Sequence, residues 1–424
     1  MTNLRLTEPS TPTSTRKSRI GLNLAGGGPL GGMYEIGALC ALKESLDGID
    51  FNELDVYVGV SVGSLVAASL ANGISPESLY RIMIGHRAAE FAFQPETFLR
   101  PAFREYSLRA RSVPKLVMEA FMTFLANPGN ISLKGAFATL GRAIPTGVFD
   151  GDQIAYMLEQ VFNAVGRSND FRDLNHKLYV IATDLDSGRS VKFGAKGRDH
   201  VPISRAVEAS CALPGLYPPV EIDGEFFVDG ALIKTLHASV SLDEGADFVL
   251  CLNPIVPYDA KLFPKIGVVQ HEKLKNGGLP VVLSQTFRAI IHSRMKVGLS
   301  KYSAQYKNAD VVLFEPSHAD AEMFFANVFS YAERNKIAEH AYQRTRQELL
   351  SRADELQPIF AKHGITMRMD VLRDRERHLA AGVKEALREE DEKRNKSPLQ
   401  RLDDTLADLE RWVKTESGNQ KRAA

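Results

Sequence analysis

Two glycine-rich turns, each set between an apolar run and a helical stretch, constrain the fold of this chain more than any other feature. Residues 20–25 form a short apolar run typical of a buried strand, glycines dominate residues 26–32, and a helical pattern covers 33–46. The order then repeats, with a strand at 55–59, a second turn and a helix at 62–72. Strand, helix, strand and helix at this spacing predict a parallel sheet covered by helices, which is an α/β fold.

Further strand signals follow in the second half of the chain. They lie at 178–183, 190–193, 247–252 and 310–314. A helix predicted over 203–211 ends where Leu213, Pro214 and Gly215 follow one another. These elements complete the expected sheet.

The length of 424 residues suits one large domain with an extension. Residues 1–18, rich in Ser, Thr and Pro, are predicted to be disordered. The main domain is expected at 19–315, with a helical cap inserted at 86–148, where the strand–helix rhythm breaks. A charged helical C-terminal extension is expected at 316–424.

Composition argues against several classes of protein. Lys plus Arg and Asp plus Glu number 52 each, so no overall charge attracts nucleic acid. Cys40, Cys211 and Cys251 are too few for a disulfide framework and lack zinc-site spacing, which favours a reducing compartment. No signal-peptide core and no apolar run of about 18 residues is found, so we expect a cytoplasmic protein without a transmembrane helix.

The turn at residues 59–63 reads Gly-Val-Ser-Val-Gly and fits the pattern Gly-x-Ser-x-Gly. Its place between a predicted strand and a predicted helix is typical of a nucleophile elbow, in which Gly59 and Gly63 allow a sharp turn and Ser61 projects freely. The helix that starts there directs its partial positive end toward developing negative charge. The alternative is an ordinary strand-to-helix turn with a capping serine.

A serine hydroxyl needs a base to act as a nucleophile, and two arrangements compete. A late histidine would serve in an α/β-hydrolase. That fold normally places several strands before its nucleophile, whereas one strand precedes this elbow, and His237, His271 and His292 are poor candidates. The other arrangement is a serine–aspartate dyad with Asp229, which a predicted strand delivers just before a glycine. An Asp-Gly pair is also a common turn.

The first glycine loop suits an oxyanion site. Gly26, Gly27 and Gly28 follow a strand and precede a helix, so their backbone N–H groups can approach a bound substrate closely. The same loop fits the dinucleotide pattern Gly-x-Gly-x-x-Gly through Gly31. A dinucleotide site expects an acidic residue at the end of the second strand, whereas Asp55 lies at its beginning.

The glycine loop, the serine elbow about 35 residues later, and a distant Asp-Gly-Ala at 229–231 together resemble the patatin-like phospholipase family. Residues 209–219, Ala-Ser-Cys-Ala-Leu-Pro-Gly-Leu-Tyr-Pro-Pro, also resemble a segment that precedes the aspartate in that family. The resemblance covers residues 20–315. It implies a three-layer α/β/α sandwich around a mostly parallel sheet.

The resemblance also implies the chemistry. Ser61 would be the nucleophile and Asp229 its general base, and the loop of Gly26, Gly27, Gly28 and Gly31 would hold the oxyanion. The substrate would be a lipid ester, cleaved through an acyl-enzyme without metal or cofactor. The family's loop usually carries Arg or Lys where this chain has Leu30. The alternative is therefore a catalytically weak or inactive patatin-fold protein that binds lipid or regulates.

Two stretches combine apolar and basic residues. The insertion at 86–148 carries eight Lys or Arg against four Glu, beside many Phe and Leu residues. The stretch at 258–308 carries nine Lys or Arg against two acidic residues, and an apolar helical face marked by Leu283, Phe287, Ile290 and Ile291. We expect core packing for both, with peripheral docking on an anionic membrane as the alternative.

A short heptad pattern lies near the C-terminus. It consists of Leu399, Leu402, Leu406, Leu409 and Val413. A helix that packs back on the body is the favoured interpretation, and self-association through this helix is the alternative.

Overall fold

The structure is a computed structural model, which describes residues 17–85, 100–126, 143–259, 274, 276–326 and 331–394. The expected disorder at 1–16, the heptad pattern at 399–413 and His271 lie outside these residues, as do 86–99 and 127–142 of the expected insertion. Residues 17–375 belong to one compact unit and residues from 376 onward to a second.

One large sheet forms the centre of the first unit. Its strands are β1 (Ile20–Leu24), β3 (Val56–Val60), β4 (Lys177–Asp184), β5 (Ser190–Phe193), β6 (Val220–Ile222), β7 (Glu225–Asp229), β8 (Phe248–Leu252) and β9 (Asp310–Phe314). They are ordered β6-β7-β4-β3-β1-β8-β9, with β5 also paired to β4. The pairs among β4, β3, β1, β8 and β9 are parallel, whereas β5, β6 and β7 pair antiparallel. The predicted α/β fold with a mostly parallel sheet is confirmed.

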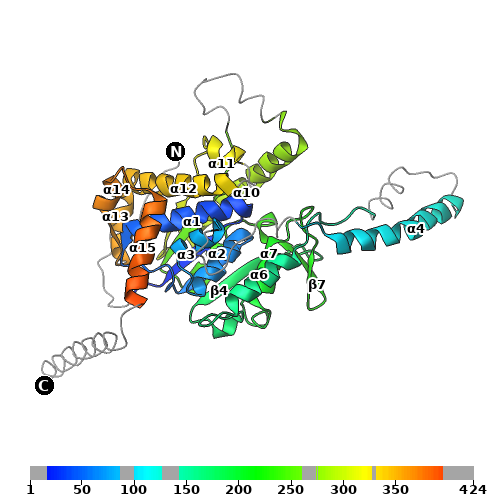
Figure 1. The fold of residues 1–424 in the computed structure, drawn as a ribbon, viewed down its shortest axis with the longest axis horizontal. Helices are drawn as coiled ribbons and strands as arrows, with labels where there is room; N and C mark the ends of the chain where they lie inside the picture. The colour runs from blue at the N-terminus through cyan, green and yellow to red at the C-terminus, as the bar shows by residue number, and fades with distance from the viewer. Residues whose placement is uncertain are drawn as a thin grey trace. The chain divides into compact units, whose positions relative to one another are not determined.

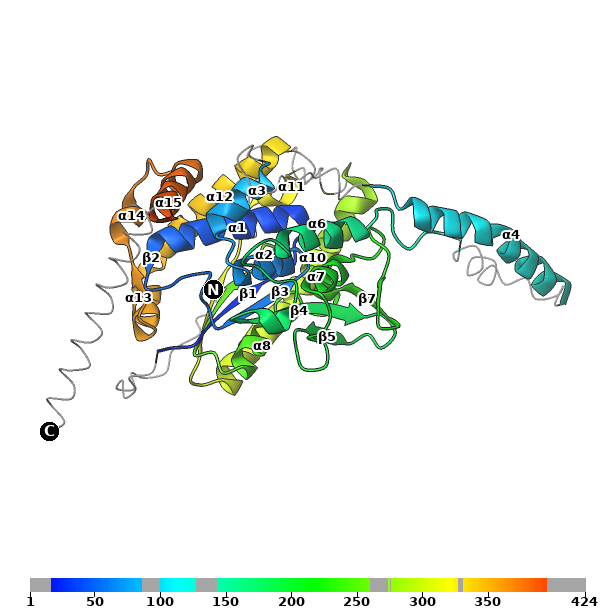
Figure 2. The same ribbon diagram turned by 60° about the horizontal axis from the view of Figure 1, so that its bottom comes forward.

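Helices cover both faces of the sheet (Figures 1 and 2). On one side lie α1 (Gly28–Ser45), α2 (Val62–Ala71), α3 (Pro76–Met83), α6 (Asp152–Phe162), α7 (Ile203–Cys211) and α12 (Tyr331–Ser351). On the other lie α8 (Ala238–Asp243) and α10 (Gly278–Gln305). Every residue of β1, β3 and β8 is buried, which explains their continuous apolar runs.

The remaining elements are shorter or lie at the edges of the first unit, except for the last helix. They are β2 (Leu46–Asp47), α4 (Phe103–Ala126), η2 (Phe171–Asp173), η3 (Gly230–Leu232), α11 (Ala321–Phe325), α13 (Ala353–Lys362), β10 (Thr366–Met367), α14 (Met369–Arg373) and α15 (Leu379–Arg394), the last in the second unit. Within the expected insertion, the start of α4 is tied to residues 146–149 by backbone and side-chain hydrogen bonds.

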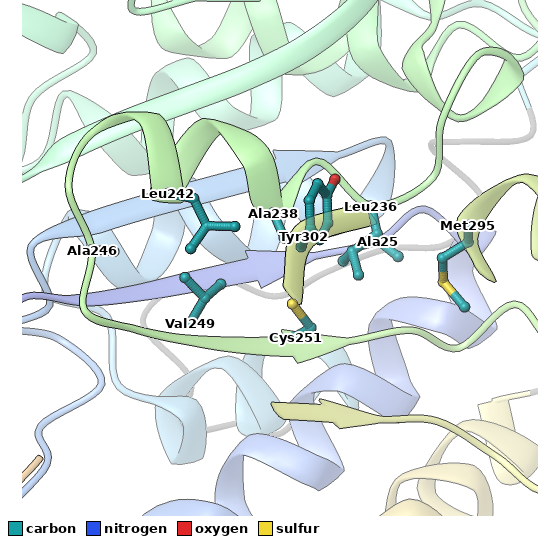
Figure 3. Close-up of a cluster of buried hydrophobic side chains, with 9 residues drawn as sticks. All are labelled: Ala25, Leu236, Ala238, Leu242, Ala246, Val249, Cys251, Met295 and Tyr302. Atoms are coloured by element: carbon teal, nitrogen blue, oxygen red, sulfur yellow. The ribbon is translucent and has the colours of Figure 1, made fainter. Parts of the chain in front are cut away.

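The core between the sheet and its second helical layer is a compact apolar cluster (Figure 3). It joins strand residues such as Val249 and Cys251 to Leu242 of α8 and to Met295 and Tyr302 of α10. Because α10 contributes side chains to this cluster, one of its faces is fixed against the sheet. None of the described helices is long and apolar enough to cross a membrane.

Residues 316–375, which the sequence assigns to the C-terminal extension, pack within the first unit. Helix α12 runs alongside α1 (Figure 1) so closely that a Cβ at Gly37 would lie 2.2 Å from the carbonyl oxygen of Ala338. At the end of the unit, β10 pairs antiparallel with β2. These residues therefore complete the helical layer over the first face of the sheet.

Candidate active site

The pairing of β4 brings two strand ends together. β5 pairs with β4 along residues 180–183. β3 pairs with residues 177–181 of β4 and β7 pairs with residues 182–184, and both stretches overlap the one that pairs with β5. β3 and β7 must therefore both lie along the other edge of β4. Val60 pairs with Ile181 and Asp229 pairs with Ala182. The carboxyl ends of β3 and β7 therefore meet beside neighbouring residues of β4, and Ser61 and Asp229 are delivered to the same place.

Ser61 has a left-handed backbone conformation, with φ 52° and ψ −130°, between β3 and α2. Such a conformation costs a non-glycine residue on the order of 1–3 kcal/mol, so the surroundings must enforce it. A Cβ at Gly59 would lie 2.3 Å from Cα of Ser64, and one at Gly63 would lie 2.5 Å from the carbonyl oxygen of Ala25. The close packing of the turn thus requires both glycines.

A buried serine that the sequence did not single out by itself holds this turn. The hydroxyl of Ser210, at the end of α7, accepts a hydrogen bond from the backbone N–H of Ser61 at 2.8 Å. It donates in turn to the carbonyl oxygen of Ile181 on β4 at 2.5 Å. Ser210 belongs to the 209–219 segment, but nothing in its residue type indicates this bridging position.

The hydroxyl of Ser61 lies close enough to the carboxylate of Asp229 to lower its pKa. Asp229 is 3% exposed and Ser61 is 7% exposed. One carboxylate oxygen of Asp229 also accepts the backbone N–H of Ala231 at 2.8 Å. Burial raises the pKa of Asp229 to about 6, and the nearby hydroxyl of Ser61 and the N–H of Ala231 partly offset that rise. This carboxylate can therefore take up a proton near neutral pH.

Cys211 is a second neighbour of the serine. Its thiol lies near the hydroxyls of Ser61 and Ser64, which lower its pKa slightly. Burial, together with the nearby charge of Asp229, raises the pKa of this thiol. The thiol therefore stays protonated and is a weak nucleophile at neutral pH.

The first glycine loop lies against the same pair. A Cβ at Gly26 would lie 3.0 Å from Cβ of Ser61 and 3.2 Å from Cβ of Ala231. Gly27 precedes the first residue of α1, Gly28, which has a φ of +62°. The N–H groups at the start of a helix have no partner within that helix, so this loop presents backbone donors beside the serine.

Two other loop positions pack inward. Gly31 faces Pro254, whose Cγ would lie 3.0 Å from an added Cβ, and Leu30 is buried in the first turn of α1. Leu30 thus places an apolar, buried side chain at the position where the family resemblance predicts Arg or Lys.

Two of the histidines that the sequence marks as poor candidates for the base have surroundings of their own. His237 precedes α8, and its burial lowers its pKa to about 3. His292 lies on α10 with its Nε2 3.4 Å from a carboxylate oxygen of Glu315. The side chains that lie near the Asp229 carboxylate include the hydroxyl of Ser61 and the thiol of Cys211.

Asp55, the acidic residue closest to a dinucleotide pattern, has a structural contact. Its carboxylate accepts the backbone N–H of Ile20 at 2.8 Å, at the amino end of β1. The amino ends of the strands lie at the opposite end of the sheet from the glycine loop, which follows the carboxyl end of β1. Asp55 therefore does not supply the acidic residue that a dinucleotide site needs beside the Gly-x-Gly-x-x-Gly loop.

The model of the patatin-like phospholipase family matches residues 22–240, just over half of the chain. The chain belongs to this family. The matched residues include the glycine loop, the elbow and Asp229.

Individual relatives are more distant. An uncharacterised protein of Acanthamoeba polyphaga mimivirus is 26% identical over 238 residues, which is 55% of this chain and 65% of that protein. An uncharacterised NTE family protein of Mycobacterium tuberculosis is 33% identical over 74 residues, which is 18% of this chain and 19% of that protein. The chain thus spans less than two thirds of the length of either relative.

Among solved structures, VipD from Legionella pneumophila is 16% identical at a TM-score of 0.37, covering 79% of this chain and 67% of VipD. The type III effector protein ExoU is 15% identical at a TM-score of 0.29, covering 82% of this chain and 61% of ExoU.

Proposed function

We propose that this protein hydrolyses fatty-acyl esters of lipids, with Ser61 as the nucleophile and Asp229 as the general base. The observation that carries the proposal is that β3 and β7 end beside neighbouring residues of β4, which places the Ser61 hydroxyl near enough to the Asp229 carboxylate to lower its pKa. Membership of the patatin-like phospholipase family supports the class of substrate.

The proposed reaction has two halves. The oxygen of Ser61 attacks the ester carbonyl carbon while Asp229 takes the hydroxyl proton, and the intermediate collapses to an acyl-enzyme as the alcohol leaves with that proton. Water then attacks the acyl-enzyme and gives a proton to Asp229, and the fatty acid is released as the departing Ser61 oxygen takes that proton back. A base with a pKa of about 6 is suited to this work near neutral pH.

The loop of Gly26, Gly27 and Gly28 is the proposed oxyanion site. Gly26 packs against Ser61 and α1 starts two residues later, which supports backbone N–H groups of this loop as donors to the negative charge that develops on the substrate oxygen. Loss of one such donor typically costs an enzyme roughly 3 kcal/mol of transition-state stabilisation. The buried Leu30 supplies no charge, so this site relies on backbone dipoles.

Labelling with a fluorophosphonate probe tests the proposal. We expect the full chain to be labelled at Ser61, and Ser61→Ala to lose labelling and hydrolysis of a short nitrophenyl ester by roughly 10⁴-fold or more. Ser69→Ala is the matched control, because Ser69 is a buried serine of α2, the helix that follows Ser61, and its hydroxyl donates to the carbonyl oxygen of Leu65. Mapping the labelled peptide separates Ser61 from the adjacent Cys211.

A folded protein that resists the probe at Ser61 would contradict the hydrolase proposal. It would favour the second candidate, a patatin-fold protein that binds lipid without turnover. The observation behind that candidate is Leu30 at the usual basic position.

A further inference from the structure

The inward face of helix α10 packs against the sheet and the segments beside it. Met295 and Tyr302 belong to the buried cluster on the sheet (Figure 3), and His292 contacts Glu315. Arg288 lies over the ring of Phe324, and its guanidinium donates to the carbonyl oxygen of Val256 at 3.3 Å. These side chains fix the rotation of the helix about its axis.

The outward face of α10 is apolar. Six side chains, between 44% and 69% exposed, recur on it at helical spacing: Leu279, Val282, Leu283, Phe287, Ile290 and Val297. The expectation that Leu283, Phe287 and Ile290 pack in the core is therefore wrong. A helix that is apolar on both faces is normally buried, so this surface calls for a partner.

The charge on α10 has one sign. Its 28 residues include Arg288, Arg294, Lys296 and Lys301 and no Asp or Glu. The last three of these cations are exposed beside the apolar face. Because the whole chain has no net charge, the positive charge is a local property of this surface.

Helix α10 also contacts the end of the sheet that holds the candidate active site. Gln285 hydrogen-bonds to both backbone groups of Tyr258, in the segment that follows β8. The guanidinium of Arg294 lies 3.4 Å from the carbonyl oxygen of Leu232, in the turn after Asp229. The exposed apolar face therefore adjoins the end of the sheet where Ser61 and Asp229 meet.

We propose that the outward face of α10 docks the protein on an anionic lipid surface, with the six apolar side chains entering the interface and the cations contacting head groups. The proposal rests on the proposed lipid hydrolysis and adds where the substrate surface is met. Apolar residues flanked by cations are what binding in the plane of an anionic interface requires.

Charge argues for a lipid surface over a second copy of the chain. A symmetric pair would bring the same helix face of two molecules together. The cations of α10 would then face one another without a carboxylate on either helix, and would repel. An anionic membrane instead neutralises them.

Co-sedimentation with vesicles tests the proposal. The full chain should bind vesicles of phosphatidylcholine with phosphatidylserine, and binding should weaken with added salt and with phosphatidylcholine alone. The triple variant L283Q/F287Q/I290Q should bind on the order of 100-fold more weakly, because three apolar side chains no longer enter the interface. The double variant K296Q/K301Q should lose the preference for phosphatidylserine. Hydrolysis of a soluble nitrophenyl ester should be unchanged in both.

The control variant is V165Q/L350Q, which removes two exposed apolar side chains elsewhere and should bind as the wild type does. Equal binding by wild type and the triple variant would overturn the proposal, as would absence of binding by the wild type. Light scattering that shows a wild-type dimer, dissociated by the triple variant, would assign the face to a second copy instead. Vesicle binding without any ester hydrolysis would overturn the proposed function and leave the docking face standing.

Discussion

At the scale of single residues, Asp229 is a carboxyl group in surroundings that disfavour its charge. Its burial raises its pKa to about 6, and neither the nearby hydroxyl of Ser61 nor the N–H of Ala231 restores the ordinary value. A general base must be ionised to accept a proton. The protonation of Asp229 therefore sets the acidic limit of the proposed activity.

We predict that kcat/KM for a soluble ester rises with pH through a midpoint of about 6, because the working, ionised form of Asp229 is populated only above its pKa. A pH profile of initial rates measures this limb. Glu208→Gln is the control, since burial raises the pKa of Glu208 on α7 to about 7. If the midpoint of the acidic limb shifts in Glu208→Gln, or lies near 4 in the wild type, then Asp229 is not the group whose ionisation limits the activity.

The sequence singled out Ser61 and Asp229 by their turns, but it does not contain the reason that they meet. That reason is the sharing of one edge of β4 by β3 and β7, which is a pairing between distant segments. Hydrophobic periodicity records which face of a strand is buried, and it does not record which strand lies beside it. The roles of the two residues stay predictions until the labelling is done.

At the scale of elements, the turn at Ser61 is held by α7 and β4 through one hydroxyl. Ser210 is fully buried and bridges the N–H of Ser61 to the carbonyl of Ile181. Without that hydroxyl both backbone groups would remain buried without this partner, next to a strained residue.

We predict that Ser210→Ala lowers stability by about 1–3 kcal/mol, because it leaves buried polar groups unsatisfied. It should also lower kcat on the order of 10²-fold, because the nucleophile loses its fixed position. Denaturant unfolding and ester hydrolysis are the two measurements. Ser204 lies on the same helix as Ser210, and its buried hydroxyl accepts a hydrogen bond from Asn169, so Ser204→Ala should cost stability and leave kcat unchanged. Equal losses of kcat in both variants would refute the positioning role.

The boundaries of most elements followed from local patterns. The predicted β5, α7 and β9 agree with the structure to the residue. Helix α1 begins earlier than predicted, at Gly28, because the glycine loop itself enters the helix. The exposure of α10 could not be predicted, since apolar residues at helical spacing indicate a face that needs covering and do not reveal whether the chain covers it.

At the scale of the molecule, the first compact unit needs its C-terminal helices. Ala338 and Tyr342 of α12 are fully buried, and Tyr342 hydrogen-bonds to Glu44 of α1. Arg346 donates to the carbonyl oxygens of Val371 and Asp374, which ties α12 to the end of the unit.

We predict that a chain ending at Arg375 unfolds cooperatively and keeps soluble esterase activity, whereas a chain ending at 330 does neither. Removal of α12 would expose the apolar surface of α1 along its length, which is a large loss of buried area. Circular dichroism during thermal unfolding, with the ester assay, distinguishes the two truncations. Native-like unfolding of the shorter chain would show that α12 is dispensable.

The pairing of β2 with β10 has a consequence for how the protein is made. Residues 46 and 47 pair with 366 and 367, and α1 packs against α12. Helix α1 therefore cannot be covered until the last third of the polypeptide has been synthesised. At ribosomal speeds of roughly 5–20 residues per second, that wait lasts on the order of 15–60 seconds. Throughout this interval a nascent segment whose side chains are almost all destined for the interior stays uncovered, which makes it the stretch where chaperones would bind during translation.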